Sequence, residues 1–139
     1  MLAAVTVGSM NACMERKTSD RDLVLVDATD AMQLVEGRKK LLGLAGATSG
    51  VWVDPRGERA YREGHIAGAI NLPFQDVASR HEELKGYEIL IVYGNTYRDP
   101  IAEAMSKRLL ELKFKDVRTL RGGLRAWTDA DLELVTGDG

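Results

Sequence analysis

Apolar runs separated by short polar or glycine-rich stretches recur along the chain. Residues 23–27 form a continuous apolar run that ends in a carboxylate, which is typical of a strand buried on both faces of a parallel sheet. Similar runs predict further strands over residues 51–54, 69–72, 89–93 and 117–120. The run at 89–93 is the most apolar, so we expect this strand at the centre of the sheet.

Between the predicted strands, apolar residues return at helical spacing. Helices are predicted over residues 30–35, 57–62, 75–85, 100–113 and 124–130. Gly43, Gly46 and Gly50 mark the stretch before the second strand as an irregular connection. Strands and helices alternate throughout, which predicts an α/β domain with a mostly parallel sheet.

The composition is that of an ordinary globular domain. Of the 139 residues, 45% are hydrophobic and 29% are charged, which excludes a disordered, collagenous or coiled-coil chain. The 19 basic and 21 acidic residues give a formal net charge of −2. This leaves no basic surplus for a phosphate backbone, so we do not expect nucleic acid as a partner. We expect one domain over residues 20–135, an N-terminal extension over 1–19 and a C-terminal tail over 136–139.

Cysteine and histidine usage narrows the chemistry further. Cys13 is the single cysteine and only His65 and His81 join it as soft metal ligands, so we expect no internal disulfide, no metal and no other cofactor. The apolar start carries no Lys or Arg over residues 1–10 and is too short to cross a bilayer, which favours a cytoplasmic protein without a membrane span. Residues 10–13 resemble a bacterial lipoprotein cleavage site, so a periplasmic or lipid-anchored location stays open.

The loop after the central strand is the first candidate site, because ligands of such sheets bind at the carboxyl ends of the strands. Around that loop the sequence resembles the rhodanese-like domains, the fold of single-domain sulfurtransferases and related phosphatases. Four separated motifs carry the resemblance over about residues 20–135: Asp-Pro-Arg at 54–56, Glu-Gly-His-Ile-Ala-Gly-Ala-Ile-Asn-Leu-Pro at 63–73, the strand that ends at Tyr93, and Leu-Arg-Gly-Gly-Leu-Arg-Ala-Trp at 120–127.

The resemblance implies a five-stranded, mostly parallel sheet with helices on both faces. It also implies a set of family motif residues with structural roles: Asp54, Arg56, Gly64, His65, Gly68, Gly122, Gly123 and Trp127. We interpret Asp54 and Arg56 as a pair that ties the second strand to neighbouring loops. His65 is expected to fix a turn through hydrogen bonds to nearby backbone.

The activity implied by the resemblance is sulfur transfer through a persulfide, formed on a cysteine that ends the central strand. In this sequence the residue after Tyr93 is glycine, and the loop equivalent to the family active site is Gly94, Asn95, Thr96, Tyr97, Arg98 and Asp99. Glycine can neither attack sulfur nor hold it, and no other loop residue is a thiol. We therefore predict no catalytic residue in this loop, and we expect Gly94 to hold a backbone conformation that only glycine tolerates.

The end of the loop predicts an internal replacement for a bound anion. Asp99 is a favoured N-cap and Pro100 a favoured first helical residue. We expect the Asp99 carboxylate to accept the free N–H groups of the next helix and to cancel the charge of Arg98. For Arg98 and Tyr97 two interpretations stay open: binding of an acidic or planar ligand, or a solvated loop tip.

The sequence thus predicts a domain that has lost sulfur transfer and serves as a binding or regulatory module for a protein partner or a small anion. The alternative is a sulfurtransferase or phosphatase-like enzyme that uses another nucleophile, Thr96 or Cys13, or a partner's cysteine. A third option is a stable fold with an unrelated surface function. Thr96 has no adjacent base, and Cys13 precedes the first predicted strand without a helix N-terminus to activate it, which favours an inert thiol.

Overall fold

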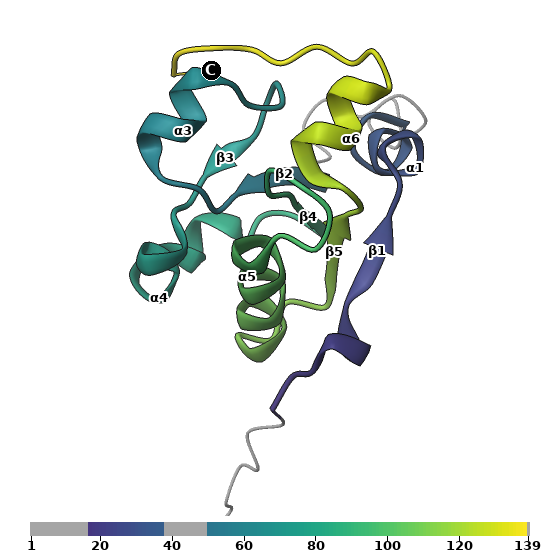
Figure 1. The fold of residues 1–139 in the computed structure, drawn as a ribbon. Coiled ribbons are helices and arrows are strands. Elements are labelled where there is room, and N and C mark those ends of the chain that lie inside the picture. The colour runs from purple at the N-terminus through teal and green to yellow at the C-terminus, as the bar shows by residue number, and fades with distance from the viewer. Residues whose placement is uncertain (1–16, 38–49, 139) are drawn as a thin grey trace, which may run out of the picture.

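The computed structural model describes residues 17–37 and 50–138 of the chain. Its centre is a sheet of five strands in which every neighbouring pair is parallel, in the order β1-β5-β4-β2-β3 (Figure 1). The strands are β1 (Val24–Val26), β2 (Gly50–Asp54), β3 (Ile70–Asn71), β4 (Ile89–Val92) and β5 (Asp116–Leu120). The predicted α/β fold is confirmed, and the most apolar strand, β4, occupies the middle of the sheet as expected.

Helices cover both faces of this sheet, with α4 and α5 on one side and α1, α3 and α6 on the other (Figure 1). The helices are α1 (Ala28–Met32), α3 (Glu58–Glu63), α4 (Val77–Arg80), α5 (Pro100–Glu111) and α6 (Gly123–Asp129). Short 3-10 or π-type segments join them: η1 (Asp20–Asp22), η2 (Gln33–Gly37), η3 (Phe74–Asp76) and η4 (His81–Leu84). None of the described helices is long and apolar enough to cross a membrane.

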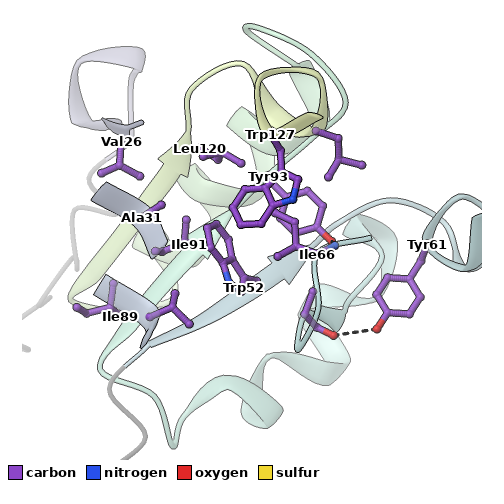
Figure 2. Close-up of a cluster of buried hydrophobic side chains, with 13 residues drawn as sticks. Val26, Ala31, Trp52, Tyr61, Ile66, Ile89, Ile91, Tyr93, Leu120 and Trp127 are labelled. Carbon is purple, nitrogen blue, oxygen red and sulfur yellow. Dashed lines mark hydrogen bonds between the residues drawn. The ribbon is translucent and has the colours of Figure 1, made fainter. Parts of the chain in front are cut away.

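Strand β4 divides its side chains between two hydrophobic cores. Ile89 and Ile91 join the core beneath α1, α3 and α6, whereas Leu90 and Val92 join the core beneath α5, as the alternation of side chains along a strand requires. In the first core, Trp52 packs edge-on against Tyr93 and Trp127, with ring centroids 6.4 and 5.2 Å away (Figure 2). The candidate loop therefore starts from a strand that is packed on both faces.

Most predicted elements lie within a few residues of those observed, and one prediction was wrong. The single helix expected over residues 75–85 is instead divided into η3, α4 and η4. The ring nitrogen Nδ1 of His81 lies 3.0 Å from the carbonyl oxygen of Val77 and 3.1 Å from that of Ala78. A side chain that binds the carbonyls of the preceding turn competes with regular helical hydrogen bonds. Gly43 and Gly46 lie outside the described residues, and Gly50 begins β2.

Candidate functional site

The carboxyl ends of β4 and β5 bring the loop 94–99 against the start of α6. The carbonyl oxygen of Gly94 accepts a hydrogen bond from the backbone N–H of Leu124 at 2.9 Å, and that of Asn95 accepts from Arg125 N–H at 2.9 Å. Gly123 has a φ of +57°, and a side chain there would place its Cβ 2.8 Å from the carbonyl carbon of Gly94. Both its backbone conformation and its close neighbours thus favour glycine at position 123.

Asp99 caps α5, as the sequence predicted. Its Oδ1 accepts a hydrogen bond from the backbone N–H of Ile101 at 3.0 Å, and Pro100 follows as the first helical residue. Its Oδ2 accepts a second hydrogen bond, from the backbone N–H of Asn95 at 2.8 Å. One carboxylate therefore satisfies N–H groups at both ends of the loop and closes it.

Gly94 lacks room for a side chain because Asp99 occupies that room. An ideal Cβ on Gly94 would lie 2.6 Å from the Cβ of Asp99 and 2.7 Å from its Oδ2. The expectation of a glycine-only backbone was wrong, since the described glycines with positive φ are Gly68, Gly122, Gly123 and Gly137. The constraint on Gly94 is steric, and it comes from the capping carboxylate five residues along the chain.

Arg98 does not pair with Asp99, contrary to prediction. Its Nε donates to Glu103 at 3.2 Å and its Nη2 to Asp20 at 3.4 Å. The hydrogen bond and charge of Glu103, followed by the charge of Asp20, raise the pKa of Arg98. The same Asp20 carboxylate binds Lys107, whose hydrogen bond and charge lower the pKa of Asp20. Because Arg98 already holds two acidic partners, an incoming anion would compete with both.

Strand β2 ends in a buried ion pair. Asp54 is fully buried and accepts from the Arg56 side chain at 3.0 Å (Nε) and 2.7 Å (Nη2), and from the Arg56 backbone N–H at 3.0 Å. Burial lowers the pKa of Arg56, but the hydrogen bond and charge of Asp54 outweigh burial, so the pKa is raised overall. Arg56 also donates to the carbonyl oxygen of Gly64 at 2.7 Å. The pair ties β2 to a neighbouring loop, as interpreted from the sequence.

Tyr93 and Asn95 connect this ion pair to the candidate loop. The Tyr93 hydroxyl donates to Asp54 Oδ2 at 2.8 Å and accepts from the Ile66 N–H at 3.3 Å. Burial, then the charge and hydrogen bond of Asp54, raises the pKa of Tyr93. The side-chain oxygen of Asn95 accepts from Arg56 Nη1 at 3.1 Å. Sequence reasoning missed both links, although the polar hydroxyl that ends an apolar run at Tyr93 was a usable signal.

His65 has the structural role that the sequence suggested. It is fully buried, its Nδ1 lies 2.8 Å from the carbonyl oxygen of Tyr61, and its ring stacks on that of Tyr61 with centroids 3.7 Å apart. Its backbone exchanges two 2.9 Å hydrogen bonds with Val135. Its Nε2 has no hydrogen-bond partner within the part of the chain that the structure describes. Gly68, in the same motif, adopts a φ of +81°.

The remaining predicted residues fall into three groups. Trp127 is buried and its Nε1 donates to the carbonyl oxygen of Glu133 at 2.9 Å, and Gly122 adopts a φ of +80°, so both have the packing and turn roles expected. Tyr97 is 63% exposed at the loop tip. Thr96 is exposed too, and its hydroxyl makes no hydrogen bond within the part of the chain that the structure describes. Cys13 lies outside the residues that the structure describes.

The chain belongs to the rhodanese-like domain family, whose model matches residues 37–130. It is 31% identical over 90 residues to the uncharacterized protein BU052 of Buchnera aphidicola, covering 62% of this chain and 60% of that protein. It is 31% identical over 118 residues to the HTH-type transcriptional regulator Rv0324 of Mycobacterium tuberculosis, covering 82% and 51%. The chain thus spans between half and two thirds of these relatives. It is also 30% identical over 77 residues to the thiosulfate sulfurtransferase GlpE of Coxiella burnetii, covering 55% and 70%.

Solved structures share the fold. A thiosulfate sulfurtransferase from Pseudomonas aeruginosa matches with a TM-score of 0.67 and 24% identity, over 89% of this chain and 22% of that one. A rhodanese-related protein from Thermoplasma volcanium matches with a TM-score of 0.62 and 18% identity, over 82% and 99%. These matches establish the rhodanese-like fold. The matched residues lie inside the domain predicted over 20–135, whose ends stay a prediction.

Proposed function

We propose that this rhodanese-like domain has no sulfurtransferase activity of its own and acts as a binding or regulatory module. The observation that carries the proposal is the position of Asp99. Its carboxylate lies where a side chain on residue 94 would project, with Oδ2 only 2.7 Å from an ideal Cβ of Gly94. The family's sulfur carrier belongs at that place, so the loop has been rebuilt around the loss of the thiol.

The rebuilt loop also opposes a bound anion. A thiolate or persulfide needs N–H donors and a helix N-terminus, and here the N–H groups of Asn95 and Ile101 already donate to Asp99. A second negative charge beside this carboxylate would meet like-charge repulsion. A protein partner that contacts the loop surface therefore fits the site better than a small anion does.

The outer surface of the loop is suited to such a partner. Residues 95–98 are exposed, and the Tyr97 ring, 63% exposed, stands beside the paired Arg98. Tyrosine and arginine are enriched where proteins bind one another. A regulatory use is in line with the relative described as a transcriptional regulator, of which this chain covers only 51%.

The direct test is thiosulfate-to-cyanide sulfur transfer by the full chain. We expect no thiocyanate above the buffer rate under conditions where the Coxiella burnetii thiosulfate sulfurtransferase turns over. The Cys13→Ser variant should behave identically. Thiocyanate release that is lost in Cys13→Ser would contradict the proposal and assign the chemistry to that thiol.

The resemblance to a thiosulfate sulfurtransferase favours one alternative, an enzyme with another nucleophile or with a partner's cysteine. In that case sulfur transfer should appear when a persulfide-carrying partner protein is added. A Thr96 nucleophile would instead show as hydrolysis of p-nitrophenyl phosphate that Thr96→Val abolishes. Activity in either assay would replace the binding-module proposal with the enzyme.

A further inference from the structure

The chain after α6 forms a strap, residues 131–138, that crosses the molecule to α3 (Figure 1). Asp131, with a φ of +58°, turns the chain out of the helix. Leu132, Leu134 and Val135 are half-buried, and the other five residues of the strap are exposed. The strap therefore lies on the outside of the domain, over elements that are themselves packed against the sheet.

Backbone hydrogen bonds hold the middle of the strap to α3 and to the turn that follows it. The N–H and the C=O of Val135 each pair with the backbone of His65 at 2.9 Å. The N–H of Gly137 donates to the carbonyl oxygen of Arg62 at 2.9 Å. These three bonds fix the path of the strap, and none of them depends on a side chain of the strap.

The start of the strap is bound to the last turn of α6. The indole Nε1 of Trp127 donates to the carbonyl oxygen of Glu133 at 2.9 Å, and the backbone N–H of Leu132 donates to the carbonyl oxygen of Trp127 at 3.2 Å. At the far end, Asp138 pairs with Arg62 at 2.8 Å, but both side chains are more than half exposed. A pair of exposed charges contributes little to stability, so the strap is held mainly by its backbone.

Helix α6 lies between the strap and the candidate loop. Its first turn donates the N–H groups of Leu124 and Arg125 to the carbonyl oxygens of Gly94 and Asn95, both at 2.9 Å, and its last turn carries Trp127. At seven residues, α6 is far shorter than the roughly 12–15 residues below which an isolated helix is marginal in water. Its stability therefore depends on the contacts beneath it and at both of its ends.

The sheet is held much more firmly than the strap. The N–H of Tyr93 donates to the carbonyl oxygen of Val53, and both residues are fully buried. Segments with few buried contacts and exposed backbone bonds open at a lower free energy than core strands do. We propose that the strap is a releasable latch on α6: it detaches while the sheet stays folded, and its detachment loosens the contact between α6 and the loop 94–99.

Detachment of the strap would thus regulate the loop from the opposite end of α6. This consequence rests on the proposed function, in which the outer surface of the loop 94–99 contacts a protein partner. A loop whose carbonyl groups are released by Leu124 and Arg125 loses the shape that the partner meets, so the attached strap corresponds to the binding form. A partner that binds only this form would in turn protect the strap, because coupling between two sites is reciprocal.

Amide hydrogen exchange of the full chain, followed by NMR, tests the proposal. We expect the N–H groups of Val135 and Gly137 to exchange at least about tenfold faster than that of Tyr93. Their exchange should also depend less on added urea, because only a small surface is exposed when the strap detaches. Equal rates and equal urea dependence for the strap and for Tyr93 would overturn the proposal.

Two proline variants release the strap without changing α6. Val135→Pro and Gly137→Pro each remove a backbone N–H that holds the strap, and proline is also incompatible with the φ of +84° at residue 137. Each variant should speed the exchange of Leu124 and Arg125 at least about threefold. The exchange of Tyr93 should stay unchanged, which shows at the same time that the sheet of each variant is folded.

Thr136→Ala is the matched control, since this exposed side chain makes no hydrogen bond within residues 17–37 and 50–138. It should change none of these rates. Proline variants that speed exchange in the strap but leave Leu124 and Arg125 at their native rates would overturn the coupling through α6. Thiocyanate release by the native protein would instead overturn the proposed function and leave the exchange results unaffected.

Discussion

Two carboxylates lie beyond the carboxyl ends of neighbouring strands β2 and β4 and have opposite surroundings. Asp54 is the last residue of β2, is fully buried, and accepts hydrogen bonds from a buried arginine and a buried tyrosine. Asp99 follows β4 after six intervening residues, is partly exposed, and accepts from two backbone N–H groups. The first ties β2 to neighbouring loops, whereas under the proposed function the second takes the place of the family's sulfur carrier.

Under the proposed function, the scaffold of this family can persist without its sulfur-transfer chemistry. The Asp54–Arg56–Tyr93 network reaches the loop through a single hydrogen bond to Asn95. The loop could therefore be rebuilt around Asp99 while the network beneath it stayed satisfied.

The largest expected effect is the loss of the buried carboxylate. Asp54→Ala leaves the Arg56 guanidinium buried without its partner, and breaking such a pair costs about 3–5 kcal/mol. Asp99→Ala removes a cap and should cost only about 0.5–2 kcal/mol. Urea unfolding of both variants measures the difference. Equal losses of unfolding free energy would show that Asp54 and Asp99 contribute equally to stability, contrary to the account.

The next effect is steric and couples two residues. Gly94→Ala should destabilise the protein by about 1–3 kcal/mol because its methyl group overlaps Asp99. Asp99→Gly removes the overlapping atoms, and glycine as N-cap is less stabilising than a polar residue by only about a few tenths of a kcal/mol. In that background, Gly94→Ala should destabilise the protein far less. A double-mutant cycle on unfolding free energies checks this. Additive values would mean that Asp99 does not exclude a side chain at residue 94.

Tyr93→Phe should cost about 1–2 kcal/mol, since the Ile66 N–H loses its acceptor while Asp54 keeps its bonds to Arg56. Tyr97→Phe, at the exposed loop tip, is the matched control and should leave the unfolding free energy unchanged. A similar cost for both variants, in urea unfolding, would contradict a specific role for the buried hydroxyl.

Tyr93→Phe also gives a pH test. The folded-state pKa of Tyr93 lies above its ordinary value of 10.0, so the unfolded chain releases this proton first as the pH rises. The stabilisation is fully present below pH 10 and decreases above it, by up to about 1.4 kcal/mol per pH unit. Above pH 10, the unfolding free energy of the native protein should therefore fall more steeply with rising pH than that of Tyr93→Phe. Equal slopes for the native protein and Tyr93→Phe would contradict the raised pKa of Tyr93.

The smallest effect concerns anion binding. Phosphate should bind the native loop only in the millimolar range or weaker. Asp99→Ser keeps a cap and removes the repulsion, so it should lower the dissociation constant by about two- to fivefold. Calorimetric titration measures both. Tight binding by the native protein that Arg98→Ala abolishes would contradict the account, because Arg98 is expected to stay with Glu103 and Asp20.

The elements were predictable from the sequence because their signals are local. The apolar run of β4, the alternation of strands and helices, and the Asp99-Pro100 cap all depend on neighbouring residues, and each is found in the structure. The division of residues 75–85 was not foreseen; the contacts of the His81 ring with the Val77 and Ala78 carbonyls accompany only the boundary between α4 and η4.

The partners of the site were less predictable because they come from distant parts of the chain. Arg98 pairs with Asp20, 78 residues before it, rather than with the adjacent carboxylate. Asn95 meets Arg56, 39 residues before it. Asp99 was foreseen as a cap, but its overlap with a side chain on Gly94 follows only from the loop's three-dimensional path.

The most direct test of the central claim is the reactivity of a thiol restored to the loop, measured as the pH dependence of iodoacetamide alkylation in a Cys13→Ser background. The account predicts that Gly94→Cys alone gives a thiol that reacts slowly at neutral pH, because Asp99 crowds it, repels its negative charge and holds the N–H donors. Adding Asp99→Gly should lower the thiol pKa and speed alkylation at pH 7 by about tenfold or more. An acidic, fast-reacting thiol in Gly94→Cys with Asp99 intact would contradict the claim that this carboxylate has taken the place of the sulfur carrier.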